Sequence, residues 1–237
     1  MSIYFNNTTP SNIYYNGAEA TLYYNGEQIW PESTIEPYNP LDLPNNTFRI
    51  KLVENTQPAA GVYKSKVQVS VNPNIWDVTV GVRPDFTSDY TKLLEVIGAN
   101  ASGCTNMSNS FSGCTALTAV SLFDISNASA IYAMFKGCLA LTTVPLYPIS
   151  NTVTSTQNMF SGCTSLSNVP LFNLSHVQDC SRMFYNCYSV NNGALALYNS
   201  LSTQATPPTS YSRTFRNCGR DTVNGAAELA QIPSDWK

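Results

Sequence analysis

Charged side chains are scarce in this sequence. Only 11% of its 237 residues are charged, less than half of the roughly 25% that is usual in soluble domains. The formal net charge is −3, so the chain lacks the basic field that neutralises phosphates, which argues against nucleic-acid binding. No apolar run approaches the roughly 18–20 residues that cross a bilayer, and residues 1–10 lack the basic start and apolar stretch of a signal peptide. The sequence therefore predicts a soluble, neutral-surfaced chain with no membrane insertion and no export signal.

Groups that carry out chemistry are equally scarce. An active site needs convergent titratable groups, but His176 is the single histidine and lies in a predicted loop. Nucleotide-binding glycine motifs, an Asp-rich calcium loop and a C-x-x-C pair are all absent from the sequence. We therefore predict that the protein is not an enzyme and has no catalytic residues, no cofactor and no metal site.

The shortage of charge is concentrated in the middle of the chain. Asp124 and Lys136 are the only charged side chains in the stretch from Val96 to Gln178. Ser, Thr and Asn take the place of charge there. A disordered segment can have a similar composition, but it lacks regularly spaced large apolar residues.

The same middle segment is an internal repeat. One phenylalanine marks each copy, at intervals of 24, 25, 24 and 31 residues: Phe111, Phe135, Phe160, Phe184 and Phe215. A cysteine follows three positions later, and leucine or valine recurs six, nine and eleven positions later in most copies. This period and the pattern L-x-x-V-x-L lie in the range of leucine-rich repeats. We expect L-x-x-V-x-L to form a short strand with inward apolar side chains, and x-M-F-x-G-C to form a short helical or irregular arm.

The repeat resembles a known family. Residues 159–171, Met-Phe-Ser-Gly-Cys-Thr-Ser-Leu-Ser-Asn-Val-Pro-Leu, are similar to the BspA-type leucine-rich repeat of bacterial surface proteins. The resemblance covers roughly residues 90–220 and implies a curved, right-handed solenoid. We therefore predict an α/β fold, a leucine-rich-repeat solenoid of four to five coils of 24–25 residues. The predicted domains are an anchoring module with a Pro-rich linker (1–45), a small β cap (46–92), the solenoid (93–220) and a C-terminal cap (221–237).

The seven cysteines are predicted to be core residues. An odd number cannot pair completely within one chain, and five of them occupy one position of the repeat. Zinc sites need four converging ligands, whereas one thiol per repeat spreads the thiols along a line. Because a buried free cysteine behaves as a small hydrophobe, we expect packing rather than metal or redox chemistry. Free thiols also fit synthesis in a reducing cytoplasm.

A second, shorter duplication opens the chain. Residues 13–17 and 22–26 each read apolar, Tyr, Tyr, Asn, Gly, which is typical of a strand entering a tight hairpin turn. Two small hairpins have little core of their own, so we expect this module to pack on another chain. Residues 11–31 resemble short segments of bacteriophage tail and other virion proteins, which implies a docking role. The candidate anchoring residues are Tyr14, Tyr15, Tyr23, Tyr24 and Trp30.

An aromatic residue follows the last leucine of three successive repeats. These residues are Phe123, Tyr147 and Phe172. Strand alternation predicts that they point away from the core in a row about one strand spacing apart. Aromatic rings among hydroxyl and amide groups suit a sugar or a protein partner, so this row is the candidate binding face. The alternative is that the row stacks on itself or is covered by the chain.

These features lead to one functional prediction and one alternative. We expect a non-enzymatic bacteriophage structural protein, a head fibre or decoration or a tail-associated protein, made in the host bacterial cytoplasm and located in the virion. Its N-terminus would dock to other virion proteins, and its repeats would serve adhesion to a host surface glycan or protein, or subunit contacts. Virion fibres of this organisation imply a homo-oligomer, a dimer or trimer. The alternative is a BspA-like adhesin on the bacterial cell surface.

Overall fold

The computed structural model describes residues 3–4, 22–24, 27–28, 43–71 and 73–237. The chain divides into two compact units, Met1–Asp42 and Leu43–Lys237. In the first unit, β1 (Ile3–Tyr4) pairs in parallel with β2 (Leu22–Tyr24), which pairs antiparallel with β3 (Glu27–Gln28). The antiparallel β2–β3 pair confirms the predicted second hairpin.

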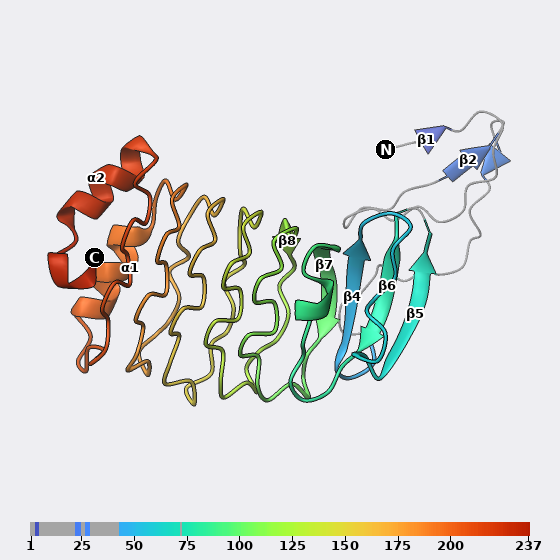
Figure 1. Cartoon of the computed structure of the whole chain (residues 1–237), viewed down its shortest axis with the longest axis horizontal. Helices are drawn as coiled ribbons and strands as arrows, with labels where there is room; N and C mark the ends of the chain where they lie inside the picture. The colour runs from blue at the N-terminus through green and yellow to red at the C-terminus, as the bar shows by residue number, and fades with distance from the viewer. Residues whose placement is uncertain (1–2, 5–21, 25–26, 29–42, 72) are drawn as a thin grey trace. The chain divides into compact units, whose positions relative to one another are not determined.

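The second unit begins with a five-stranded sheet (Figure 1). Its strands are β4 (Thr47–Leu52), β5 (Ser65–Ser70), β6 (Ile75–Thr79), β7 (Leu93–Asn100) and β8 (Ala119–Val120). They lie in the order β5-β6-β4-β7-β8, antiparallel except for the parallel β7–β8 pair. In β4 alternate side chains are buried, as expected for a strand with one face on the core. Strands β4, β5 and β6 lie within residues 46–92, for which a small β cap was predicted.

The predicted fold class, an α/β leucine-rich-repeat solenoid, is wrong. The regular structure of residues 43–71 and 73–237 is one mixed five-stranded sheet with only two short α-helices and two 3-10 turns, so this unit is mostly β. Between β8 and α1 (Ala194–Ser202), the described residues form no further strand and no helix. Irregular segments of 24–25 residues lie side by side there (Figure 1), joined by isolated bridges such as Ser155↔Asp179.

Proline and left-handed residues explain why strands and helices do not form in these segments. Pro145 and Pro170 stand inside two of the predicted strands, and proline lacks the N–H that a sheet requires. The copy with Ser121 at that position contains β8. In each predicted arm two residues have positive φ, for example Asn158 at 58° and Gly162 at 78°. A residue in the left-handed backbone conformation interrupts a right-handed helix, and glycine and asparagine adopt this conformation at least cost.

Backbone hydrogen bonds join each repeat to the next. The N–H groups of Ala133, Phe135 and Gly137 donate to carbonyls of residues 157, 159 and 161 at 2.9, 2.9 and 2.8 Å. Intervening N–H groups bond within their own arm, as Cys138 N does to Phe135 O at 3.2 Å. The irregular backbone is therefore satisfied without a regular sheet, which allows it to be buried.

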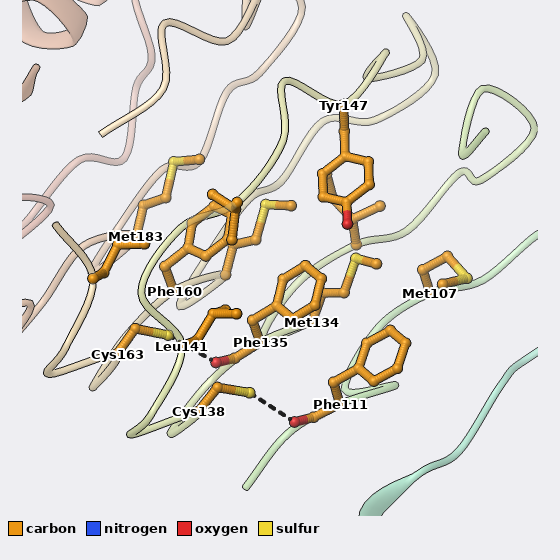
Figure 2. Close-up of a cluster of buried hydrophobic side chains, with 14 of the residues drawn as sticks. Met107, Phe111, Met134, Phe135, Cys138, Leu141, Tyr147, Phe160, Cys163 and Met183 are labelled. Atoms are coloured by element: carbon orange, nitrogen blue, oxygen red, sulfur yellow. Dashed lines mark hydrogen bonds between the residues drawn. The ribbon is translucent and has the colours of Figure 1, made fainter. Parts of the chain in front are cut away.

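The core of this region is a row of stacked phenylalanine rings. Phe111, Phe135 and Phe160 come from successive repeats and stack with ring centroids 5.2 and 5.7 Å apart (Figure 2). The row begins at Phe86 and ends at Trp236. All five phenylalanines that mark the repeat are fully buried, which confirms that the spacing identified the core.

The C-terminal part packs two helices beside the last repeats. Helix α1 has no side-chain cap of its own, since Gly193 precedes it. Glu228 in α2 (Val223–Gln231) accepts hydrogen bonds from Gly193 N at 3.2 Å and Leu195 N at 3.1 Å. A carboxylate at a helix N-terminus satisfies unpaired N–H groups and complements the helix dipole. The 3-10 helix η3 (Ser234–Trp236) follows and brings Trp236 onto Phe215.

Among the residues that the structure describes, no helix has the length and hydrophobicity needed to cross a membrane.

Candidate functional site

The structure places the three predicted surface aromatics in the core. The exposed fractions of Phe123, Tyr147 and Phe172 are only 3, 2 and 1%. Tyr147 and Phe172 stack on the phenylalanine row, with centroid distances of 6.1 Å to Phe135 and 5.8 Å to Phe160. The expected outward orientation of this row is therefore wrong, both in the two repeats with proline and in the repeat that has Ser121 at that position. The row is packed against other rings of the same chain, as the alternative reading required.

The leucines one position earlier occupy the surface instead. Leu122, Leu146 and Leu171 are 56, 59 and 56% exposed, although the sequence pattern predicted that they point inward. We call these three side chains the leucine face. Two adjacent apolar residues cannot both face the core of an extended segment, so the pairs Leu122-Phe123 and Leu146-Tyr147 carried a signal that one of them is exposed. The larger aromatic ring is the one buried.

The residues around the leucine face in the sequence carry little charge, and three of their hydroxyls are engaged by the backbone. Thr118, Thr142 and Ser167 precede the three leucines, and their hydroxyls donate to carbonyls of the previous repeat at 3.0, 3.4 and 2.9 Å. Asp124 is the charged residue nearest in sequence, two positions after Leu122. Scattered exposed leucines are ordinary, but a row repeated at one position marks a candidate interaction site.

The predicted anchoring residues fall in the N-terminal unit. Tyr23 and Tyr24 lie in β2, and their backbones pair with Gln28 and Glu27 of β3. Tyr14, Tyr15 and Trp30 lie outside the described residues. Their anchoring role stays a prediction.

The cysteines are free and buried, as predicted. The sequence did not reveal that their thiols are hydrogen-bond donors. Sγ of Cys138, Cys163 and Cys187 each donates, at 3.1 Å, to the carbonyl of the phenylalanine one repeat earlier (Figure 2). Burial raises the pKa of Cys163 to about 12 and the pKa values of Cys138 and Cys187 well above their ordinary value. These thiols are therefore protonated and unreactive at neutral pH.

One cluster of titratable side chains in the described part of the chain surrounds Asp89, and its contacts fit a structural role. No group of three or more His, Cys, Asp and Glu residues there could hold a metal ion. His176 is exposed in a loop. Asp89 is fully buried, but it is engaged by Tyr63 Oη at 2.6 Å, Lys92 Nζ at 2.8 Å and the backbone N–H of Ala59 at 3.1 Å. A buried carboxylate with this many partners holds loops together.

A comparison with protein-family models decides the family. Residues 86–204, half of the chain, match the model described as "Mycoplasma protein of unknown function, DUF285". The chain belongs to this family. The DUF285 match spans the first four marked repeats and overlaps most of the stretch that resembles BspA-type repeats, so it gives limited support to that resemblance. It carries no link to bacteriophages.

No curated protein and no solved structure matches the chain.

Proposed function

We propose that this DUF285 chain is a non-enzymatic structural and adhesion protein that binds another protein through its leucine face. The observation that carries the proposal is the row of Leu122, Leu146 and Leu171, each more than half exposed at the same position of successive repeats. Burying such side chains against a partner gives about 25 cal/mol for each Å² of apolar surface removed from water. Monomeric proteins seldom leave such rows uncovered.

The chemistry of this face favours a protein partner over a neutral sugar. Sugar recognition uses aromatic rings and polar groups with free hydrogen-bonding capacity. Here the aromatic rings are buried, and the hydroxyls of Thr118 and Ser167 already donate to backbone carbonyls. Leucine side chains fit the apolar centre of a protein interface.

For the location of the protein we propose a bacteriophage particle, with residues 1–45 attached to other virion proteins and Leu43–Lys237 displayed. Support comes from the duplicated hairpin sequence and from the division of the chain into two compact units near residue 42. The alternative is a BspA-like adhesin on the bacterial cell surface, and the DUF285 match supports this alternative. The two proposals differ in where the chain is found and in what residues 1–45 do.

The location has a direct test. Mass spectrometry should find the full chain in purified particles, and deletion of Met1–Asp42, which leaves the second unit whole, should abolish its incorporation while the remaining chain stays soluble. Particles without the chain, together with its recovery in the cell-envelope fraction of uninfected bacteria, would establish the surface alternative.

The leucine face is tested by replacing all three leucines with serine. We expect the triple variant L122S/L146S/L171S to keep its folded circular dichroism spectrum, because these side chains are exposed, and to enter particles through residues 1–45. Binding should fall about tenfold or more, since each leucine loses about 1 kcal/mol or more of burial at the interface. The readouts are the adsorption rate of particles to host cells and the number of chain copies in each particle.

The matched control is L139S at Leu139, which is 45% exposed at another position of the repeat. The control should leave both readouts unchanged. A lower adsorption rate would show that the leucine face binds a host protein. A lower number of chain copies in each particle would show that it binds a virion protein. If the triple variant equals wild type in both readouts, the leucine face has no binding role.

A further inference from the structure

The predicted arms carry positive charge only. They are five segments of eight residues: 107–114, 131–138, 156–163, 180–187 and 211–218. Together they contain Lys136, Arg182, Arg213 and Arg216 but no aspartate or glutamate. All four cationic side chains are exposed. Asp179 directly precedes the fourth arm, and its carboxylate accepts a hydrogen bond from Ser181 N at 2.9 Å. The arms themselves are basic although the whole chain has a net charge of −3.

Three of the cations gather on the last two arms. Arg182 N donates to Ser212 O at 3.1 Å, which places Arg182 beside Arg213 in the neighbouring arm. Asn186 N donates to Arg216 O at 2.9 Å, which brings Arg216 to the same pair of arms. None of the three arginines forms an ion pair with a residue that the structure describes. Unpaired guanidinium groups side by side repel one another unless an anion lies between them.

The last arm also has two backbone donors without acceptors. In each earlier arm, the N–H groups of the two positive-φ residues donate to the next repeat, as Arg182 N and Asn186 N do. The equivalent residues of the last arm are Arg213 and Asn217, with φ of 60° each. Their N–H groups have no acceptor among the described residues, whereas Phe215 N between them donates to Trp236 O at 3.0 Å. The repeat therefore ends in two open donors on either side of Phe215.

We propose that this end, formed by Arg182, Arg213, Arg216 and the N–H groups of Arg213 and Asn217, binds the anionic groups of an acidic polysaccharide. Each of these two N–H groups is free to donate a hydrogen bond to an anionic oxygen, and hydrogen bonds to charged acceptors are the stronger ones. Guanidinium groups recognise sulfate, phosphate and carboxylate oxygens with paired hydrogen bonds. We name this the basic end.

A tyrosine at the basic end favours a sugar polymer over an acidic peptide. Tyr185 occupies the same arm position as Arg216 in the adjacent repeat and is half-buried. The exposed part of such a ring offers an apolar face and a hydroxyl to a sugar ring. Tyr211 is also half-buried, with one ring face covered by Trp236 at a centroid distance of 4.3 Å. Lys136 extends the positive edge two repeats further along the arms, which suits a ligand with charges repeated along its length.

The test measures binding of the full chain to a heparin-derived sulfated oligosaccharide by calorimetry. In the double variant R213Q/R216Q we expect the Kd to rise about tenfold, since exposed charge contacts contribute up to about 1 kcal/mol each. Added salt should weaken wild-type binding more steeply than binding of this variant. The control variant K64Q/R83Q removes the same charge from two exposed positions outside the arms and should change the Kd less than about twofold.

Three outcomes would overturn the proposal. Equal losses in the two double variants would show attraction by net charge alone, and undetectable binding to wild type would remove the site. Tighter binding to polyglutamate or to single-stranded DNA of equal charge would assign the basic end to an acidic protein or a nucleic acid. The basic end and the leucine face share no residue, so failure here leaves the proposed protein contact standing, and the reverse also holds.

Discussion

Replacing Phe160 with alanine should lower the free energy of unfolding by about 3–5 kcal/mol, the usual cost of a Phe→Ala change in a packed core. Phe160 is fully buried and stacks between Phe135 and Phe184 with centroid distances of 5.7 and 5.2 Å. Phe172 packs on it at 5.8 Å. The cavity cannot collapse readily, because backbone hydrogen bonds on either side fix the spacing of the repeats. Domains are typically stable by only about 5–15 kcal/mol, so this one change removes a large part of the total.

Urea unfolding followed by circular dichroism gives the free energy from the midpoint and slope. The matched control is Leu171→Ala, which removes an aliphatic side chain from the same repeat at an exposed position and should cost within about 0.5 kcal/mol. Phe160→Leu should fall between them, since most of the volume is kept. A loss below about 1 kcal/mol for Phe160→Ala, or equal losses at Phe160 and Leu171, would show that the stacked row does not hold the repeats together.

The repeat spacing alone was enough to find this core. Residues that recur with the phenylalanine, such as Cys163 three positions later and Leu166 six positions later, are fully buried. Periodicity reports which residues share an environment, because neighbouring copies must bury equivalent side chains against each other. It therefore identified the buried positions without any knowledge of the backbone that carries them.

Periodicity did not determine the backbone or the direction of each side chain. L-x-x-V-x-L fits a strand, but Pro145 and Pro170 remove the N–H groups that a strand would use. The alternation that the aromatic prediction relied on also fails in the copy with Ser121, where Leu122 is exposed and Phe123 is buried. The two prolines therefore explain the missing strands, whereas the adjacent leucine and aromatic residues were the signal for the side-chain directions.

Other features depend on residues far apart in the sequence. Glu228 accepts hydrogen bonds from the first turn of α1, 33 to 35 residues earlier, and no local pattern announces such a contact. The two open N–H groups of the basic end are equally hidden, since Arg213 N lacks an acceptor only because no further repeat follows it in the structure. The charges of Arg182, Arg213 and Arg216 were visible in the sequence, but their gathering on adjacent arms was not.

Raising the pH above about 9 should unfold the protein, because all seven cysteines are free and buried. Burial raises the pKa of Cys104 and Cys180 to about 11 and that of Cys114 and Cys163 to about 12. The pKa values of the other three, Cys138, Cys187 and Cys218, are raised further above their ordinary value by the same cause. In the unfolded chain a thiol ionises near pH 8.5.

The free energy of unfolding falls as the pH rises, because the unfolded chain releases its thiol protons at a lower pH than the folded chain. Below about pH 8.5 the thiols are protonated in both states, and their contribution to stability is fully present. Between that pH and the folded pKa of about 11 to 12, the unfolded chain has lost protons that the folded chain keeps. The free energy of unfolding then falls by about 1.4 kcal/mol per pH unit for each cysteine. Seven cysteines give roughly 10 kcal/mol per pH unit, which is comparable to the whole stability of a domain.

Urea midpoints measured under reducing conditions from about pH 7 to about pH 10 test this expectation, with thiolate absorbance followed in the same samples. The midpoint should be flat up to about pH 8.5 and then fall steeply, and thiolate should form only as the chain unfolds. In the variant Cys163→Ala the slope above that pH should be smaller by about 1.4 kcal/mol per pH unit, whatever stability the variant loses at neutral pH.

Tyr63 and Tyr147, whose pKa values burial also raises, act in the same direction only above about pH 10. A fall that starts near pH 8.5 and shrinks with each cysteine removed therefore belongs to the buried thiols. A flat midpoint up to about pH 10 would mean that the thiols are open to solvent.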